Sequence, residues 1–171
     1  MKKFFLAILF AVVFTVSTSA QVVAMQNLKE KIGIGFNTTW EHVPVFACRY
    51  WLTDDTGVEG FTGFRINNEN KYYDFEDYFV LGGKLLRIIK SYNNLNVIAS
   101  TTFSVNCQNK SKSTSCMHPD KSYLAFLVSF GLEWFVLDNL SLSADADFRL
   151  TVGDSRIRFA TYPEISIKFY L

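Results

Sequence analysis

The chain has 171 residues, enough for one domain and a targeting segment. Its formal net charge of +1 gives no reason to expect nucleic acid or an acidic surface as a partner. Charged residues make up 19% of the chain and aromatic residues 16%. That is apolar for a soluble protein, in which about a quarter of the residues are charged. Beyond residue 20, however, no run of about 18 apolar residues predicts a membrane-spanning helix, so the apolar side chains must be arranged in another way.

Residues 1–20 have the pattern of a cleavable secretory signal. Two lysines precede an apolar core at 4–16, and small residues follow, with Ala20 at the last position that a signal peptidase reads. Cleavage after Ala24 is an alternative. The core is too short to favour a membrane anchor helix. We therefore expect removal of the signal and export, which leaves 21–30 as a short periplasmic N-terminal segment.

The remaining chain, 31–171, alternates between apolar and polar residues with a period of two, the signature of β-strands with unlike faces. In the clearest segments, leucine, valine and phenylalanine occupy one face, and serine, aspartate and arginine occupy the other. A tilted strand that crosses a bilayer needs about 9–11 residues, which these segments approach or exceed. Eight segments of this kind occur, at 32–40, 46–53, 58–66, 78–90, 95–105, 124–136, 140–152 and 159–171.

The fourth segment, 78–90, is apolar on both faces in places, and its phase is ambiguous around 85–87. If the alternation continues unbroken, Arg87 faces outward near one end of the segment. A long side chain can reach the membrane surface from there at little cost. A β-bulge that turns Arg87 inward is the alternative.

The connections between segments are of two kinds. Those after the second, fourth and sixth segments (54–57, 91–94 and 138–139) are tight and rich in turn-forming residues. Those after the first, third, fifth and seventh are longer or more polar, and they include 67–77 and 106–122. Short periplasmic turns at one end and longer external loops at the other are typical of outer-membrane barrels.

The residue types predict that the apolar face points outward. It consists of leucine, isoleucine, valine and phenylalanine, whereas the polar face is rich in small residues with single charges among them. Such a face suits the narrow interior of eight strands. A soluble lipocalin-like barrel binding an apolar ligand is the alternative, but its exterior would carry many more lysines and glutamates. We therefore expect an all-β fold, an eight-stranded antiparallel up-and-down transmembrane β-barrel.

The charges on the polar face are nearly balanced, which predicts a lumen plugged by ion pairs. Unpaired charges in a narrow interior are costly, whereas paired ones are tolerated. The alternative is a small pore for ions or small solutes, which eight strands leave little room to form. The expected lumen charges are Lys31, Arg49, Arg65, Lys84, Arg149 and Lys168, against Glu59, Glu133, Asp145, Asp147 and Glu164.

With these features the chain resembles the small eight-stranded bacterial outer-membrane barrels, the family of the outer membrane protein A transmembrane barrel. Residues 49–60 resemble a strand–turn–strand that recurs in bacterial barrel sequences. The ending Phe169, Tyr170 and Leu171 is similar to the C-terminal signal read by the barrel-assembly machinery, although that signal usually finishes in Phe or Trp. The resemblance implies an outer-membrane location, contacts with outer-membrane lipids and the assembly machinery, and a structural or surface-interaction role. Any surface ligand would bind the external loops, and the sequence does not identify it.

No arrangement of residues predicts catalysis. The two histidines, His42 and His118, fall in predicted external connections, and neither has a convincing serine or aspartate partner on an adjacent strand end. Asp145 and Asp147 both face the lumen, but pairing with Arg149 and neighbouring bases explains them better than acid–base chemistry does. We therefore expect a protein that is not an enzyme and that needs no cofactor and no metal.

Cys107 and Cys116 lie in one predicted external connection, and export places them in an oxidising compartment. We therefore expect a disulfide that closes this loop. A soft-metal site formed by 116–118 together with Cys107 is the alternative. Cys48 is expected on the lipid face as a small apolar residue.

Overall fold

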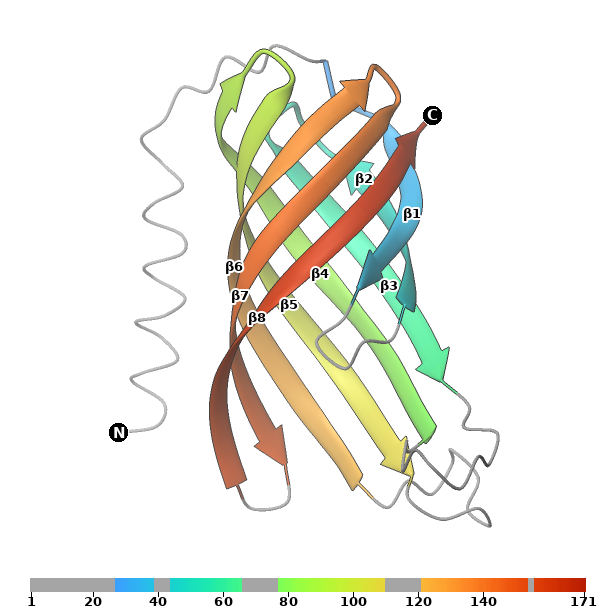
Figure 1. The fold of residues 1–171 in the computed structure, drawn as a ribbon, viewed down its shortest axis with the longest axis vertical. Coiled ribbons are helices and arrows are strands. Elements are labelled where there is room, and N and C mark those ends of the chain that lie inside the picture. The colour runs from blue at the N-terminus through green and yellow to red at the C-terminus, as the bar shows by residue number, and fades with distance from the viewer. Residues whose placement is uncertain (1–26, 39–43, 66–76, 110–120, 154–155) are drawn as a thin grey trace.

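The computed structural model describes residues 27–38, 44–65, 77–109, 121–153 and 156–171. They form one closed barrel in which each strand is antiparallel to the next and the last strand pairs with the first (Figure 1). The predicted eight-stranded antiparallel up-and-down barrel is confirmed. No helix in the described part of the chain is long and apolar enough to cross a membrane. The strands are β1 (Ile32–Thr38), β2 (Pro44–Trp51), β3 (Thr56–Arg65), β4 (Asp77–Tyr92), β5 (Leu95–Asn109), β6 (Lys121–Leu137), β7 (Leu140–Gly153) and β8 (Arg156–Tyr170).

Burial alternates along the strands with the period that the sequence predicts. In β1 and β2, each buried residue is followed by an exposed one, and the exposed positions are mostly large and apolar. The buried positions face the lumen and include glycine, alanine, serine and charged residues. The two faces of each strand therefore follow directly from the alternation of residue types.

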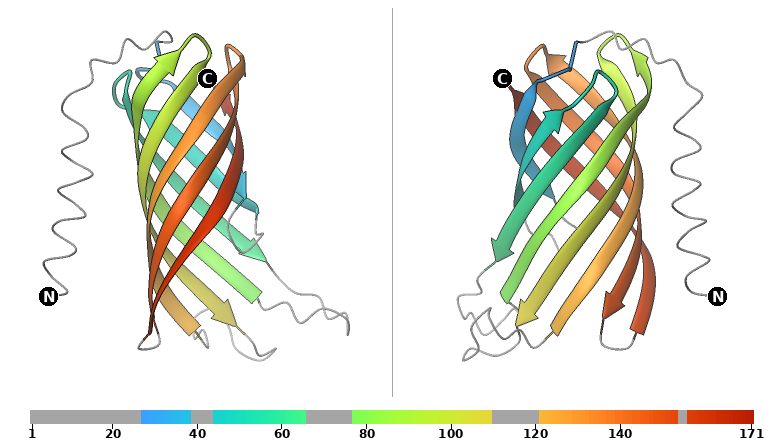
Figure 2. Two further views of the ribbon diagram at one scale, coloured as in Figure 1. Left: turned by 60° about the vertical axis from the view of Figure 1, so that its left-hand side comes forward. Right: turned by 180° about the vertical axis from the view of Figure 1, so that it is seen from behind.

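Short turns gather at one end of the barrel, which we call the turn end; the opposite end is the loop end. The turns after β2, β4 and β6 lie there together with the C-terminus (Figures 1 and 2). In the two-residue turn between β4 and β5, Asn93 has φ of 45°, a left-handed conformation that asparagine tolerates well. At the loop end, only two residues, Asp154 and Ser155, separate β7 from β8, so the connection after the seventh segment is short and polar.

The strands are strongly staggered around the barrel. Gly33 pairs with Tyr170 across the β1–β8 seam. When the register is followed the other way around, from β1 through each neighbour to β8, Gly33 leads instead to Ala160. The difference of ten residues along β8 is the stagger that tilts the strands and sets the barrel's width. The residues on this path are Gly33, Arg49, Glu59, Lys84, Thr102, Leu127, Arg149 and Ala160.

The β1–β8 seam is the shortest of the eight, with register partners only between 33–37 and 166–170. Just beyond it, the Thr38 hydroxyl donates to the Ile165 carbonyl oxygen at 3.1 Å and accepts from the Ile165 N–H at 3.0 Å. The backbone N–H groups of successive residues in a strand point to opposite sides. The nitrogen of Pro163, two residues before Ile165, therefore faces the β1 side of β8, as the Ile165 N–H does. Because proline has no N–H, the seam ends without an unpaired donor at this position.

Arg87 faces outward. Leu86 is fully buried on the lumen side, and the Arg87 Nη2 atom lies 3.5 Å from Asp55 Oδ2 at the turn end. The pairing of β4 with β5 does contain a register shift, but it falls between Ile88 and Lys90, beyond the arginine. The alternative in which a bulge turns Arg87 inward is therefore wrong.

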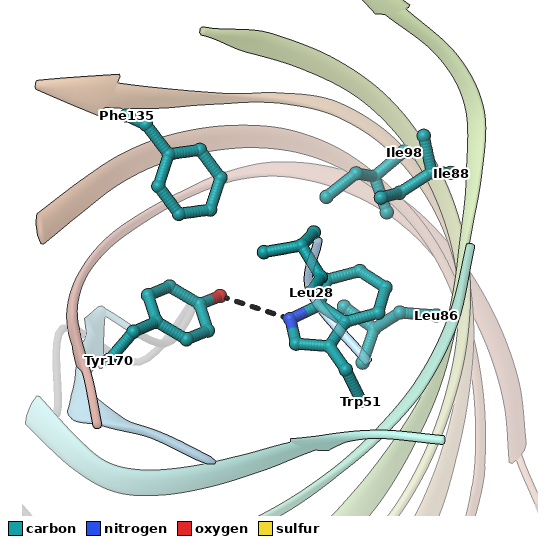
Figure 3. Close-up of a cluster of buried hydrophobic side chains, with 7 residues drawn as sticks. All are labelled: Leu28, Trp51, Leu86, Ile88, Ile98, Phe135 and Tyr170. Atoms are coloured by element: carbon teal, nitrogen blue, oxygen red, sulfur yellow. Dashed lines mark hydrogen bonds between the residues drawn. The ribbon is translucent and has the colours of Figure 1, made fainter. Parts of the chain in front are cut away.

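The sequence predicts a polar inner face for the strands. Two apolar clusters nevertheless fill parts of the lumen. The turn-end cluster is drawn in Figure 3 and consists of Leu28, Trp51, Leu86, Ile88, Ile98, Phe135 and Tyr170. The loop-side cluster consists of Val45, Tyr78 and Val80, with Phe61 and Tyr123 packed against it. On β2, Arg49 lies between Val45 of one cluster and Trp51 of the other. Arg49 is thus enclosed between two apolar layers.

Candidate functional site

The best-defined polar site is an ion-pair network in the lumen, formed by Arg49, Glu59, Glu133 and Lys168. Arg49 donates through Nε to Glu59 Oε2 at 2.8 Å and through Nη1 to Glu133 Oε1 at 2.9 Å. Lys168 Nζ lies 3.3 Å from Glu59 Oε2. Two cations and two carboxylates balance each other here, and all four side chains are buried. Burial makes this balance necessary, because an unpaired charge in such a site is very unfavourable.

Neutral side chains add further hydrogen bonds to this network. Asn37 donates to Glu59 Oε1 at 2.8 Å and accepts from Lys168 at 3.0 Å. The Tyr170 hydroxyl donates to Glu133 Oε1 at 2.8 Å. The network therefore links β1 and β8, which form the short seam, to β3 and β6 on other parts of the wall.

A second group of charges, the carboxylate layer, lies in the same lumen and consists of Lys84, Asp145, Asp147 and Glu164. Lys84 Nζ is 3.3 Å from Asp145 Oδ2 and 2.9 Å from Glu164 Oε1. Asp145 and Glu164 are register partners on β7 and β8, so Lys84 separates two carboxylates that would otherwise face each other directly. Asp147 follows two residues later on the same face of β7 and is buried.

Gly131 makes room for this layer. It is the register partner of Asp145, and a Cβ atom added at Gly131 would overlap the Asp145 carboxylate. The absence of a side chain at 131 therefore lets the Asp145 carboxylate lie over the β6 wall of the lumen. Any larger residue would have to displace it.

The remaining predicted lumen charges lie apart from these two groups. The Arg149 guanidinium is 5.2 Å from the centre of the Tyr123 ring, on the loop side. Arg65 is the last residue of β3, at the loop end, and is half-buried. Lys31 is half-exposed just before β1, at the turn end, and the structure does not bring it into the ion-pair network.

The turn end of the lumen is closed by a residue that the sequence did not single out. Leu28 is fully buried in the turn-end cluster, although it lies before the first strand (Figure 3). A turn at 29–30, with Glu30 at φ of 66°, brings the leucine side chain into the turn end of the barrel. Glu30 N donates to the Trp51 carbonyl oxygen at 2.8 Å, and Trp51 Nε1 donates to the Tyr170 hydroxyl at 3.4 Å. A single leucine among the polar residues of 26–31 has no periodicity, so no pattern could have revealed it.

The loop side of the lumen is also filled. Tyr78 donates its hydroxyl to Asn106 Oδ1, and Asn106 in turn donates to the Ser104 hydroxyl at 3.0 Å. The Tyr78 ring packs with Val45 and Val80. Among the described residues, side chains thus occupy the lumen at the turn end, at the level of the charges and on the loop side.

The exterior of the barrel is a band of exposed apolar side chains. In the folded barrel, the side chain of Phe64 is 71% exposed, that of Phe148 54% and that of Phe130 49%. Cys48 lies in this band, as expected for the lipid face. Other members of the band are Ile34, Phe36, Phe46, Leu81, Leu85, Phe103, Val105, Leu132, Leu142, Val152, Phe159, Ile165 and Ile167.

The residues of the predicted C-terminal signal divide between the two faces. Phe169 and Leu171 point outward and are exposed, whereas Tyr170 points into the lumen. Recognition of these residues by an assembly machinery stays a prediction.

The predicted disulfide also stays a prediction, because Cys116 lies outside the described residues. Cys107 is in β5 rather than in a loop, since the strand continues to Asn109. The signal at 1–20, His42, and the soft-metal alternative at 116–118 likewise fall outside the described part of the chain. Within the described ranges, no three His, Cys, Asp or Glu side chains form a metal-binding group.

Comparison with known proteins identifies the fold. No protein-family model matches the chain, and no curated protein matches it. Among solved structures, the chain is similar to the N-terminal β-barrel domain of Pseudomonas aeruginosa OprF, with 14% identity and a TM-score of 0.58 over 84% of this chain and 98% of that one. It is also similar to Neisserial surface protein A, with 12% identity and a TM-score of 0.51 over 82% of this chain and 92% of that one. The resemblance to small eight-stranded outer-membrane barrels is thus confirmed at the level of the fold.

Proposed function

We propose that this chain is an integral outer-membrane barrel with a filled lumen, and that it has a structural or surface-interaction role through its external loops. The turn end would face the periplasm and the loop end the outside. The protein would be neither an enzyme nor an open pore. Its direct surroundings would be outer-membrane lipids.

The observation that carries this proposal is the apolar exterior of a closed barrel. Soluble monomers rarely expose a continuous apolar patch larger than a few hundred Å². Here every strand presents exposed leucine, isoleucine, valine or phenylalanine. The buried lumen positions, by contrast, include the charged residues Arg49, Glu59, Lys84, Glu133, Asp147, Arg149 and Lys168. This distribution is the reverse of a soluble ligand-binding barrel. It suits a bilayer, because a closed barrel leaves almost no backbone group unpaired in lipid.

The turn end has the residues expected where a barrel meets the lipid headgroups. Tyr50, Tyr92 and Trp134 face outward near the ends of β2, β4 and β6. Lys90 Nζ lies 4.8 Å from the centre of the Tyr92 ring. Tyrosine and tryptophan are enriched at membrane interfaces because one part of the ring is apolar and the other forms hydrogen bonds with water. This supports placement of the turn end at one surface of the membrane.

The filled lumen supports a plugged barrel over a small pore. A conducting path would have to pass Leu28 and Trp51 at the turn end, the ion pairs of Arg49, and Tyr78 on the loop side. Side chains occupy the lumen at each of these three levels. The connections at the loop end would then carry any specific interaction.

The test is the behaviour of the full-length chain when it is expressed in a Gram-negative host. We expect recovery in the outer-membrane fraction after carbonate washing, and a folded form that migrates differently on gels before and after boiling. The variant Phe130→Arg/Phe148→Arg places two charges in the apolar band and should reduce the folded membrane fraction. A wild-type chain found as a soluble monomer without detergent would contradict the proposal.

A further inference from the structure

The outer face of the barrel is almost free of charge. Among the outward-facing strand residues whose side chains the structure describes, only Arg87 and Lys90 are charged, and both are cations on β4. A charged side chain on the lipid face of a barrel lowers stability near the middle of a bilayer and costs little near its surface. In a membrane barrel, this pair is therefore tolerated only close to a membrane surface.

A β-bulge places the two cations on the same face. Residues 87 and 90 are three positions apart, so an unbroken strand would direct them to opposite faces. The register of β4 with β5 shifts just after Ile88, which pairs with Ile98 on the lumen side. After the shift, Lys90 pairs with Val97 on the outer side. Bulges commonly re-aim a side chain in this way, and without this one Lys90 would point into the lumen.

The aromatic residues of the turn end indicate the depth of this pair in a membrane. Lys90 Nζ lies 4.8 Å from the centre of the Tyr92 ring. Tyr92 and Trp134 are both register partners of Leu95, one on each side of it, and both are exposed on the outer face. Outward-facing tyrosine and tryptophan are typical of the level at which a membrane barrel meets the lipid headgroups. In the proposed barrel, the cations would therefore lie close to the lipid phosphates.

Asp55 offsets only part of this positive charge. Arg87 Nη2 lies 3.5 Å from Asp55 Oδ2, and the same carboxylate accepts hydrogen bonds from the hydroxyls of Thr53 and Thr56. Among the ion pairs of the described residues, Asp55 is the only carboxylate that contacts either cation. One carboxylate against two cations leaves this group with a net charge of +1. The contact also directs the arginine toward the turn end, where the headgroups would be.

We propose that Arg87 and Lys90 bind the headgroup phosphate of an anionic phospholipid on the outer face of β4. Guanidinium and ammonium groups are the side-chain donors that bind phosphate in proteins. The net positive charge favours a headgroup that has no ammonium group of its own, such as phosphatidylglycerol, over phosphatidylcholine. This inference rests on the proposed function, because the lipid belongs to the leaflet that surrounds the turn end.

The test measures which lipid lies beside this part of the barrel. The full-length protein is refolded into vesicles of phosphatidylcholine and phosphatidylglycerol, with bromine atoms on the acyl chains of one lipid at a time. Trp134 is the reporter, because it is aligned with Tyr92 across β5. We expect stronger quenching by brominated phosphatidylglycerol, equivalent to a preference of about fivefold, the effect of one positive charge near an anionic lipid surface.

Two contrary results of this test have different meanings. Equal quenching by the two brominated lipids would overturn the proposed lipid site and leave the membrane barrel standing. Quenching by neither lipid would overturn the proposed function, and the lipid site with it.

Variants separate the site from the general attraction of anionic lipid to basic residues. Arg87→Gln/Lys90→Gln should abolish the preference. Lys29→Gln/Lys31→Gln removes the same charge from the turn end but not from the outer face, and should preserve it. Asp55→Asn should strengthen the preference, because it removes the carboxylate beside Arg87. If the first double variant does not fold, Lys90→Gln alone changes an exposed residue and should reduce the preference severalfold. A preference that survives loss of Lys90, or that both double variants lose equally, would overturn the proposal.

Discussion

The ring of Tyr170 occupies the space that Gly33 leaves empty on the neighbouring strand. The two residues are register partners across the β1–β8 seam. A Cβ atom added at Gly33 would lie only 2.7 Å from Tyr170 Cε1. In this position the tyrosine hydroxyl reaches Glu133 at 2.8 Å. The pair thus joins the closing seam of the barrel to the ion-pair network in the lumen.

We predict that Gly33→Ala destabilises the barrel by about 1–3 kcal/mol, the usual cost of overpacking a filled interior. The added methyl group would push the Tyr170 ring away from Glu133 and weaken a seam of only five register pairs. Urea unfolding in detergent measures the change. Gly60→Ala is the matched control, because a Cβ atom there meets nothing within 4 Å. Equal effects of the two substitutions would contradict the role of the Gly33–Tyr170 contact.

The ion-pair network makes Arg49→Met a severe substitution. It leaves the buried Glu59 with Lys168 as its remaining ion-pair partner and removes the ion pair of the buried Glu133. Removing one partner of a buried ion pair typically costs about 3–5 kcal/mol. We therefore expect a large loss of the compact, heat-modifiable form on gels. Lys31→Met removes a half-exposed cation outside the network and should have little effect; a comparable loss there would contradict this account.

Leu28 should stabilise the barrel although it precedes β1. Its side chain is fully buried against Trp51 and Tyr170, so Leu28→Ala removes packed methyl groups and leaves a cavity. Such substitutions usually cost about 2–5 kcal/mol. Asn27→Ala, at the exposed neighbouring position, is the control. A urea midpoint for Leu28→Ala that equals the control's would show that the segment before β1 does not close the turn end.

Asp55, in the turn between β2 and β3, should make a pH-dependent contribution to the stability of the barrel. The Thr53 hydroxyl donates to Asp55 at 2.6 Å and lowers the pKa of Asp55, and Thr56 and Arg87 act in the same direction. Because the folded pKa lies below the unfolded pKa, this contribution is complete above the unfolded value. It is lost as the pH falls through the folded value.

We therefore expect Asp55→Asn to be less stable than wild type at neutral pH and equal to it at strongly acidic pH. Urea midpoints measured across the acidic range test this expectation. A difference between the two proteins that persists when Asp55 is protonated would assign the effect of the substitution to something other than the carboxylate's charge.

The strands and their faces could be predicted because a β-strand has a fixed period of two. Arg49 and Glu133 were both placed in the lumen from their own segments alone. Their contact at 2.9 Å joins residues 84 positions apart, and it depends on the stagger of the whole barrel. The alternation assigns a face but not a height along the axis. Sequence could therefore name the lumen charges without showing which of them meet.

The closures of the lumen were harder to predict for a different reason. Leu86, Ile88 and Ile98 are apolar and face inward, so they blur the alternation instead of marking a site. Only in the folded barrel do these residues come together at the turn end, where they pack in one cluster with Leu28. Similarly, Gly131 reads as one more small lumen residue until the Asp145 carboxylate is seen to fill its place.

The most direct test of the central claim is the environment of Cys48. This residue lies on the outer face of β2 between Ile34 and Gly60 of the neighbouring strands. With Cys107 and Cys116 replaced by serine, a fluorescent thiol probe can be attached at this one position in protein refolded into lipid vesicles. An integral barrel with its apolar face in lipid predicts quenching by bromine atoms near the middle of the acyl chains and none by iodide in water. Quenching by iodide, without quenching by the brominated lipid, would contradict it.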